Sequence, residues 1–473
     1  MIQETNVKFY DRGRIQELSS LEELYEKNGF KFAVVYGRRR VGKTSLINEF
    51  IDRGNKKAIR FIATENTDLV NRESFSESIF EVYPESSEFG TFATWEKAFR
   101  YVAKETGGEK LVVYMDEYPY LAKAHPPISS EIQKIIDTVL IRTNILLILC
   151  GSSMSFMENQ VLGYQSPLYG RRTAQYKIEP LDYYDSAEFF GSASLESKLL
   201  GYAVTGGIPQ YLNEISQFGS IEDGIEKAFF TKNGYLYEEP HNLLKQELRE
   251  PAFYNAIINA IATGSTKLNV ISGKVGEMDN KVAKYVKNLI DLGIIEKEIS
   301  VLAKNDRNGI YRIKDNMYLF WYRFVKENVS RVESRYQNIY KEMVEPQITE
   351  FMGHVFENIC LQYLTRLNIS GRLPFSFDGA GRWWGGNPIT KQETEIDIIA
   401  HSKKEIIFGE CKWKNDKVGP DVYSELKKKA AMFSERELYY YIFSKSGFTE
   451  SLKKEAEMDD RLKLVGLNDL FDV

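Results

Sequence analysis

The residues whose types and spacing most directly indicate chemistry lie near the N-terminus, in the run Gly37-Arg38-Arg39-Arg40-Val41-Gly42-Lys43-Thr44-Ser45. This run has the spacing G-x-x-x-x-G-K-[ST], in which backbone N–H groups point at a phosphate chain and glycines let it approach. A lysine placed as Lys43 reaches the β- and γ-phosphates, and a hydroxyl placed as Thr44 binds Mg²⁺. We therefore expect the whole run to bind a nucleoside triphosphate together with Mg²⁺.

The chain around this loop supplies the setting that phosphate binding needs. Residues 31–36 are a short β-rich run before the loop, and residues 46–50 have a helical pattern after it. A helix that begins at the loop adds the positive end of its dipole to the anion site. The alternative is a glycine-rich turn in a basic surface loop, which does not require this order of strand, loop and helix.

Two adjacent acids, Asp116 and Glu117, follow the apolar run of residues 110–115. An unbroken apolar run of this length indicates a buried parallel strand. At the end of such a strand an acid placed as Asp116 holds Mg²⁺ in phosphate-loop enzymes, and Glu117 is placed to act as general base on the attacking water. The alternative is a pair of acids in a solvated turn.

Further polar candidates follow the next apolar run, residues 144–150. If that strand lies between the strands of the loop and of the acids, Ser152 or Ser153 comes near the γ-phosphate; a serine turn that caps the next helix is the alternative. Arg171 or Arg172 could stabilise charge on the γ-phosphate, either in the same chain or from a neighbouring subunit, which would require a homo-oligomer. A basic loop that faces solvent is the alternative there.

Strands alternate with helices throughout this part, which predicts an α/β fold with a parallel three-layer sheet. Up to about residue 235 the chain resembles the AAA-like, STAND-type P-loop ATPases that are usually called archaeal-type ATPases. The resemblance is carried by Gly37 to Ser45, the strand that ends in Asp116-Glu117, Gly151-Ser152-Ser153, Pro167 to Arg172, and Gly207-Ile208-Pro209. It implies ATP or ADP as the nucleotide and a helical lid in which Pro209 lies near the adenine.

The pattern changes between residues 250 and 315, where three helical stretches precede two short β-rich stretches. This is the order of a winged helix. Lys281, Lys284 and Lys287 recur along one face of the third helical stretch, as in a recognition helix that contacts DNA phosphates. Two alternatives stay open, because many winged helices only pack between domains and exposed lysines often only solvate a helix.

A second group of charged residues lies near the C-terminus. Glu410 and Lys412 are two positions apart on an expected strand, so both side chains point to the same face. With Asp397 on a neighbouring strand, two carboxylates and one amine converge. Carboxylates bind Mg²⁺ or Mn²⁺, and the lysine can orient a water molecule or stabilise phosphoryl charge.

These residues resemble the core of the PD-(D/E)XK nucleases, a restriction-endonuclease-like fold. Asp397, Glu410 and Lys412 match its motif and Glu357 matches the acid of its first helix, although no proline precedes Asp397. With the ATPase part, the resemblance extends over nearly the whole chain, to archaeal-type ATPases that carry a nuclease-like C-terminal domain. The alternative is a domain that kept the fold and lost cleavage.

Composition sets wider limits. The 473 residues are 43% hydrophobic and 27% charged, with a net charge of −5, so only a local basic face could bind a polyanion. No run approaches the ~18 apolar residues of a membrane helix, and the N-terminus lacks the pattern of a signal peptide. The three cysteines and four histidines are dispersed, which favours reduced thiols and argues against a zinc site. We expect a cytoplasmic protein that does not enter membranes.

Together these features predict three domains: a P-loop ATPase domain with a helical lid at 1–235, a winged helix at 236–325 and a nuclease-like α/β domain at 326–473. The expected function is Mg²⁺-dependent ATP binding and hydrolysis that controls the C-terminal module, which would act on DNA. The alternative function is a slow switch between ATP and ADP states, in which the nuclease fold is inactive and serves signalling or protein binding.

Overall fold

The computed structural model describes residues 12–303, 309–387, 391–433 and 435–473. The chain divides into two compact units. Unit 1 contains the residues up to Pro180 together with Ile208–Gln210, and unit 2 contains Leu181–Gly207 and Tyr211–Val473. The predicted division into domains at 1–235, 236–325 and 326–473 stays a prediction, since the compact units separate at residue 180.

Unit 1 is built on a parallel sheet with the strand order β2-β3-β4-β1-β5. The strands are β1 (Lys31–Tyr36), β2 (Ala58–Ile62), β3 (Lys110–Asp116), β4 (Asn144–Gly151) and β5 (Ala174–Lys177). Strand β4 lies between β3 and β1, which meets the condition that the sequence set for a serine of residues 152–153 to come near the phosphate-binding loop. The central strands are buried on both faces, which explains their unbroken apolar runs.

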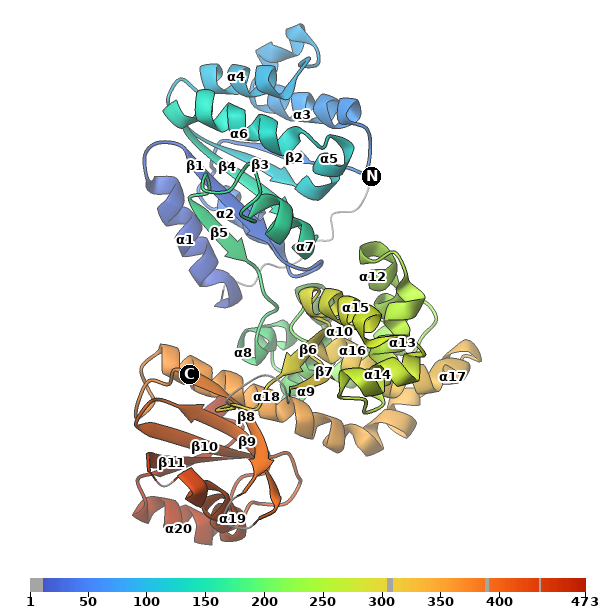
Figure 1. The fold of residues 1–473 in the computed structure, drawn as a ribbon, viewed down its shortest axis with the longest axis vertical. Helices are drawn as coiled ribbons and strands as arrows, with labels where there is room; N and C mark the ends of the chain where they lie inside the picture. The colour runs from blue at the N-terminus through green and yellow to red at the C-terminus, as the bar shows by residue number, and fades with distance from the viewer. Residues whose placement is uncertain (1–11, 304–308, 388–390, 434) are drawn as a thin grey trace. The chain divides into compact units, whose positions relative to one another are not determined.

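Helices cover both faces of this sheet (Figure 1). They are α1 (Ile15–Glu26), α2 (Lys43–Asp52), α3 (Asp68–Val82), α4 (Trp95–Glu105), α5 (Tyr118–Ala124), α6 (Ile128–Thr138) and the short α7 (Met154–Phe156). Helices α3, α4 and α6 pack on one face around a core that includes Phe75, Trp95 and Phe99, and α1 and α2 lie on the other face. The predicted three-layer α/β fold is therefore confirmed for this part of the chain.

Unit 2 begins with helices, three of which match the helical stretches predicted between residues 250 and 315. They are α8 (Tyr183–Ser186), α9 (Leu195–Thr205), α10 (Pro209–Ser216), α11 (Ile221–Phe229), α12 (Glu239–Glu247), α13 (Pro251–Ala262), α14 (Leu268–Val275) and α15 (Asp279–Asp291). Helix α10 starts within the short stretch that groups with unit 1. Strands β6 (Ile295–Glu298) and β7 (Ile310–Ile313) then form an antiparallel pair. The predicted loop of this hairpin, residues 305–308, lies outside the described residues.

The C-terminal part of unit 2 is a mixed sheet of order β12-β11-β10-β9-β8. The strands are β8 (Gly379–Gly386), β9 (Glu393–His401), β10 (Glu405–Lys412), β11 (Glu437–Ser444) and β12 (Leu462–Val465). The helices that precede or cover the sheet are α16 (Asn316–Phe320), α17 (Val329–Glu333), α18 (Ile348–Ile369), α19 (Pro420–Ala430) and α20 (Glu450–Met458). Helix α18 lies on one side of the sheet, and α19 and α20 lie on the other (Figure 1).

No helix in the described ranges is long and apolar enough to cross a membrane.

Candidate functional site

The phosphate-binding loop joins β1 to α2, and its glycines are required by the backbone. Gly42 has a φ of +89°, in the left-handed region, and immediately precedes the first residue of α2. A Cβ atom at Gly37 would lie 2.4 Å from the carbonyl oxygen of Ile178, so no larger residue fits. Arg40, a non-glycine residue, also has a positive φ of 70°. The loop therefore holds a conformation that costs energy, as is common at functional sites.

Lys43 lies inside the loop. Its Nζ donates hydrogen bonds to the carbonyl oxygens of Gly37 at 3.0 Å and Arg38 at 2.9 Å, and the residue is only 7% exposed. Burial lowers the pKa of its ammonium group. Phosphate oxygens can take the place of these carbonyl oxygens and add opposite charge, which makes the ammonium group a suitable partner for a phosphate chain.

Asp116, at the end of β3, is hydrogen-bonded to Thr44, the other residue predicted to bind Mg²⁺ here. Thr44 Oγ1 donates to Asp116 Oδ2 at 2.7 Å, and the hydroxyl of Tyr114 donates to the same oxygen at 2.6 Å. The backbone N–H of Glu117 donates to Asp116 Oδ1 at 2.8 Å. Asp116 is buried, and a hydroxyl beside a carboxylate is an oxygen donor set that suits Mg²⁺. Tyr114 lies within the apolar run of β3, so no local pattern marks it as a residue of the site.

Glu117 follows Asp116 and is oriented by β4. Ser152 Oγ lies 3.1 Å from Oε1 and 3.0 Å from Oε2 of Glu117, so the hydroxyl donates to the carboxylate. Glu117 has a φ of 48°, a left-handed conformation that is costly for this residue. The place beside the γ-phosphate that the sequence predicted for Ser152 or Ser153 stays a prediction. In the structure the hydroxyl of Ser152 holds the expected general base. Ser153 is the N-cap residue of α7, and its side chain makes no capping hydrogen bond.

Two further predicted residues are Arg39, within the loop, and Pro209, beside it. Arg39 Nη2 donates to the hydroxyl of Tyr120 on α5 at 3.0 Å. Pro209 groups with unit 1, and its Cγ lies 3.8 Å from the position of a Cβ atom built on Gly42. Although it lies far along the chain, Pro209 is therefore next to the phosphate-binding loop, and its contact with adenine stays a prediction.

The contacts of Arg171 and Arg172 lie outside this cluster. Arg171 forms an ion pair of 3.0 Å with Asp137 of α6, and Arg172 Nη1 donates to the carbonyl oxygen of Leu162 at 3.1 Å. The guanidinium of Arg172 also lies 5.7 Å from the ring centroid of Tyr169. A role of either arginine at the γ-phosphate remains a prediction from the sequence.

The second cluster lies in unit 2, where β9 and β10 pair in antiparallel register. Ile398 is opposite Gly409, so Asp397 and Glu410 follow at the neighbouring position of the ladder. The backbone N–H of Cys411 donates to Asp397 Oδ2 at 2.8 Å. The structure thus brings the two predicted carboxylates to the same end of the strand pair.

Two lysines bind the Glu410 carboxylate. Lys412 Nζ lies 2.5 Å from Oε1, and Lys429 Nζ, from α19, lies 3.2 Å from Oε2. Glu410 is buried, and the two ammonium groups balance its charge. Lys429 lies 19 residues beyond Glu410, so no spacing in the sequence indicates this contact.

Burial and charge raise the pKa values of the acids in this cluster. The pKa of Asp397 is raised to about 6, mainly by burial and secondly by the negative charge of Glu410. The Cys411 N–H, Lys412 and Lys429 act in the opposite direction. The pKa of Glu357 on α18 is raised to about 7, mainly by burial and secondly by the negative charge of Asp397. Such shifts are frequent where acids are arranged for chemistry, although structural clusters also show them.

The cluster offers a metal ion two carboxylates, Asp397 and Glu410. Among the described residues no group of three or more His, Cys, Asp and Glu side chains could hold a metal ion. Mg²⁺ commonly binds through one or two carboxylates and completes its shell with water and substrate phosphates. Asp397 and Glu410 would be those two carboxylates, and a phosphate-bearing substrate would supply further oxygens.

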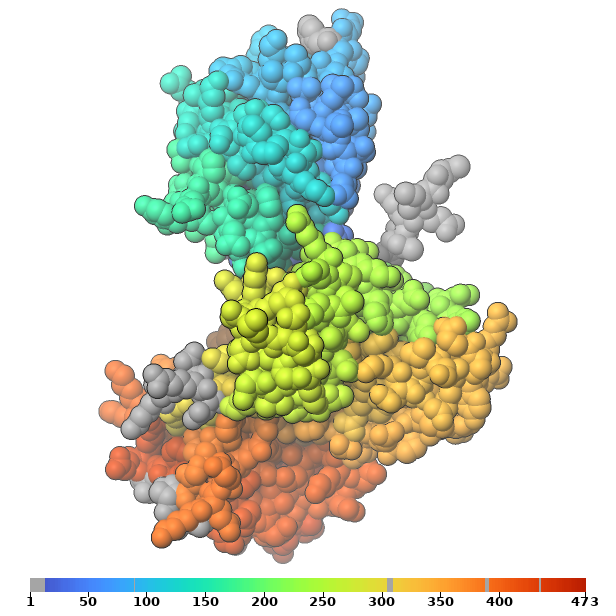
Figure 2. Space-filling model, turned by 45° about the vertical axis from the view of Figure 1, so that its right-hand side comes forward, coloured from blue at the N-terminus to red at the C-terminus, as the bar shows by residue number. Residues whose placement is uncertain are grey.

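The three predicted DNA-contacting lysines are exposed on α15. The part of unit 2 that contains this helix is light green to yellow in Figure 2. Lys281 forms an ion pair of 2.6 Å with Glu277 and lies 4.8 Å from the ring centroid of Phe253. Lys284 and Lys287 lie along the same helix. The helix therefore presents positive charge to solvent, while Val282, Val286 and Leu289 on its other face are buried.

Two families of known proteins match separate parts of this chain. A family described as an ATPase domain predominantly from Archaea matches residues 9–215, and a family described as archaeal and bacterial proteins of unknown function matches residues 321–431. The uncharacterized protein MJECL04 of Methanocaldococcus jannaschii is 33% identical over 439 residues, which cover 91% of this chain and 95% of that protein. The chain belongs to the same family as this protein, with a domain of the archaeal ATPase family followed by a C-terminal part that matches the family of unknown function.

Two further similarities are shorter or more distant. The uncharacterized ATP-binding protein MJ0423 of the same organism is 47% identical over 47 residues, 10% of this chain and 76% of that protein. The Walker-type ATPase PABY2304 of Pyrococcus abyssi has 19% identity and a TM-score of 0.50, and the match covers 67% of this chain and 96% of that one. At this identity the second likeness concerns the fold alone.

The ATPase therefore has a P-loop α/β unit that binds and hydrolyses nucleotide, followed by a C-terminal part with its own sheet. The predicted resemblance to archaeal-type ATPases is confirmed at this level. Its STAND-type classification, the winged helix and the nuclease-like domain stay predictions.

Proposed function

We propose that this ATPase hydrolyses Mg²⁺-bound ATP, and that its nucleotide state governs a C-terminal module that consists of a winged helix and a nuclease-like domain and acts on DNA. The observation that carries the proposal for the C-terminal module is the arrangement on β9 and β10. There Asp397, Glu410 and Lys412 come together at one end of two paired strands.

In the proposed ATP site each residue has a separate task. Lys43 neutralises the β- and γ-phosphates, and Thr44 and Asp116 hold Mg²⁺, which would neutralise charge on the phosphate oxygens. Glu117 accepts the proton of the attacking water. Ser152 keeps the Glu117 carboxylate in one orientation through its hydrogen bond. Arg171 or Arg172 would approach the γ-phosphate, either within the same chain or from a neighbouring subunit of a homo-oligomer.

The proposed contact with DNA uses the lysines of α15. The order α13, α14, α15, β6 and β7 supports a winged helix, in which the third helix meets the major groove. Lys281, Lys284 and Lys287 would contact phosphates, which gives affinity without much sequence preference.

The three cysteine thiols form no disulfide, which fits a reducing compartment such as the cytoplasm.

A second candidate function is a slow switch between ATP and ADP states whose nuclease-like domain does not cut. One observation favours it: both carboxylate oxygens of Glu410 are already bound by ammonium groups, of Lys412 and Lys429. A metal ion would have to compete with these two lysines. In this function the C-terminal domain is a contact surface for nucleic acid or protein.

The experiment is a cleavage assay with the full chain on duplex DNA, single-stranded DNA and RNA, with Mg²⁺ or Mn²⁺, with and without ATP. We expect metal-dependent cleavage of DNA that Asp397→Ala, Glu410→Ala and Lys412→Ala each abolish. The first two variants also lose metal binding, whereas Lys412→Ala retains it, because an ammonium group is no metal ligand. Absence of cleavage in the wild type, with every substrate and metal, would favour the switch.

A further inference from the structure

Unit 1 is joined to unit 2 by a short stretch whose contacts connect it to both functional parts of the chain. Strand β5 ends at Lys177, and the boundary between the compact units falls after Pro180. We refer to residues 178–185 as the connecting segment. Its first residues belong to unit 1 and its last residues to unit 2.

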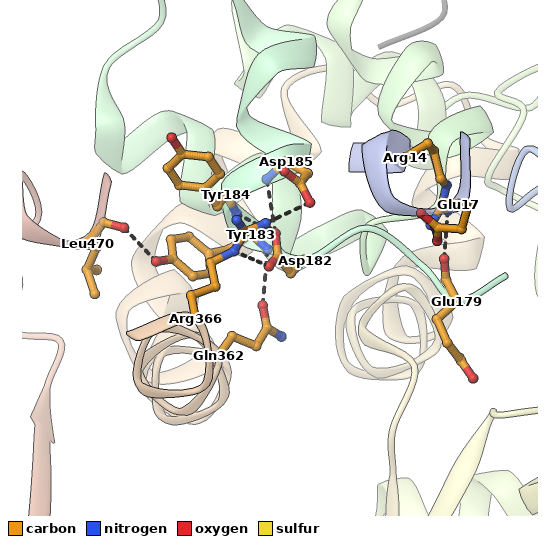
Figure 3. A network of polar contacts seen from close by, with 10 residues as sticks. All are labelled: Arg14, Glu17, Glu179, Asp182, Tyr183, Tyr184, Asp185, Gln362, Arg366 and Leu470. Carbon is orange, nitrogen blue, oxygen red and sulfur yellow. Dashed lines mark hydrogen bonds and ion pairs between the residues drawn. The ribbon is translucent and has the colours of Figure 1, made fainter. Parts of the chain in front are cut away.

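At its first end the segment is held by Arg14. The Nη2 atom of Arg14 donates to the carbonyl oxygen of Val41, in the phosphate-binding loop, at 3.1 Å. The same atom donates to the carbonyl oxygen of Glu179 at 2.7 Å (Figure 3). Arg14 is 7% exposed, and Glu17 lies 3.4 Å from its Nη1. Hydrogen bonds from a charged donor are about twice as strong as neutral ones. One buried guanidinium thus joins the phosphate-binding loop to the connecting segment.

The same end of the segment also packs on the loop directly. The backbone N–H of Ile178 donates to the carbonyl oxygen of Tyr36, the last residue of β1, at 2.7 Å. The Ile178 carbonyl oxygen is the atom that a side chain at Gly37 would strike. A displacement of the loop at Gly37 or Val41 therefore acts on residues 178 and 179 through direct van der Waals contacts and hydrogen bonds.

At its second end the segment is held by α18, within unit 2. Arg366 Nε lies 2.5 Å from Asp182 Oδ2, and its Nη2 lies 2.8 Å from Asp182 Oδ1 and 2.7 Å from Asp185 Oδ2 (Figure 3). The N–H of Tyr183 donates to Gln362 Oε1, on the same helix, at 3.1 Å. A two-pronged arginine–carboxylate pair fixes orientation as well as distance.

We propose that the connecting segment transmits the nucleotide state of the phosphate-binding loop to α18, and that Arg14 is the positioning residue at its start. When phosphates replace the carbonyl partners of Lys43, the loop loses two internal hydrogen bonds and Val41 moves. Glu179 follows because Arg14 binds both carbonyl oxygens, and Asp182, three residues further, carries the displacement to Arg366. Helix α18 also bears Glu357, so the displacement reaches the acidic cluster of unit 2.

The test measures amide hydrogen exchange of the full chain with and without Mg²⁺ and adenylyl imidodiphosphate, an ATP analogue that is not hydrolysed. In the wild type the analogue lowers deuterium uptake in residues 37–45, in 178–186 and in the second half of α18. In Arg14→Gln the effect in 37–45 remains and the effects in 181–186 and α18 are lost, whereas Arg14→Lys keeps part of them. In Arg366→Gln the effect remains up to residue 180 and is lost in α18, with nucleotide affinity unchanged.

Arg100→Gln is the matched control, since Arg100 makes an exposed ion pair with Glu96 on α4 and its loss should change none of these effects. A wild type in which the analogue changes nothing beyond residue 180 would overturn the proposal. So would an Arg366→Gln protein with the full effect in α18. If Arg14→Gln does not fold or bind nucleotide, the Arg366→Gln result decides alone. The outcome does not depend on cleavage by the C-terminal domain.

Discussion

Lys43 is the residue whose charge matters most for nucleotide affinity. It is buried among carbonyl oxygens of its own loop, so its ammonium group is already positioned for a phosphate chain. Lys43→Ala should weaken ATP binding at least tenfold, about 1.4 kcal/mol or more, as measured by titration calorimetry. Lys110→Ala, which removes an ion pair with Glu26 elsewhere on unit 1, should bind ATP normally. Wild-type affinity in the Lys43 variant would contradict the placement of the site.

Glu117 should separate binding from hydrolysis. Glu117→Gln keeps the shape of the side chain and removes the base, so ATP affinity should stay within about twofold while turnover falls at least ~10²-fold. Ser152→Ala should reduce turnover less, because it frees the carboxylate but leaves the base in place. Steady-state phosphate release measures both. Unchanged turnover in Glu117→Gln would show that another group activates the water.

Glu357 should make stability depend on pH. Its pKa rises from an ordinary 4.5 to about 7 in the folded protein, so above pH 4.5 the folded chain holds a proton that the unfolded chain has released. The free energy of unfolding therefore falls as the pH rises from about 4.5 to 7, by roughly 1–3 kcal/mol, and is level above that. The shift of Asp397 to about 6 has the same sign.

Urea denaturation at pH 5 and pH 8 measures this effect. We expect the difference between the two values to shrink in Glu357→Gln, and to stay as in the wild type when the exposed Glu345 is changed to Gln. A difference that is the same in Glu357→Gln and in the wild type would show that Glu357 does not carry the shift.

The sequence identifies a functional residue when that residue belongs to a motif with fixed spacing. Lys43 and Thr44 belong to a continuous motif, and Asp116 ends a recognisable strand, so their positions followed from the pattern. Arg14 and Lys429 act through contacts with residues far along the chain, at Glu179 and Glu410. No local pattern encodes such a contact, since it arises only when the sheet and its helices assemble.

At the scale of elements, the sequence predicted the phosphate-loop sheet well because each buried strand is an unbroken apolar run. Strand β4 separates β1 from β3, an arrangement that the sequence raised only as a condition, and this brings Ser152 to Glu117. The C-terminal sheet was less predictable. Its central strands β9 and β10 were expected, but the position of the parallel pair β10–β11 depends on α19, which crosses between these two strands.

Helix α15 should be the element that gives DNA binding its salt dependence. Changing Lys281, Lys284 and Lys287 together to Gln in the full chain should weaken binding of duplex DNA. It should also reduce the slope of log affinity against log salt by up to about three, near one per lysine. Fluorescence anisotropy at several salt concentrations measures both quantities.

A matched triple change of Lys97, Lys104 and Lys134, exposed lysines of unit 1, serves as the control and should leave the slope unchanged. If the α15 variant keeps the wild-type affinity and slope, the helix only packs or solvates, and the interpretation as a DNA-contacting winged helix is wrong.

At the scale of the whole molecule, the two functional clusters lie in different compact units of one chain. The family match and the phosphate-loop geometry make unit 1 an ATPase, while unit 2 contains both the lysines of α15 and the acids of β9 and β10. An ATPase needs no second unit for hydrolysis alone. This arrangement is the basis of the proposal that the nucleotide state controls unit 2.

The affinity of the full chain for duplex DNA in its ATP-bound and ADP-bound states tests this claim most directly. Glu117→Gln with Mg²⁺ and ATP holds the first state, and the same protein with ADP holds the second. We expect the two affinities to differ at least about fivefold, the lower range of coupling between linked sites. Equal affinities in the two states, with both nucleotides shown to be bound, would contradict control of the C-terminal module by ATP.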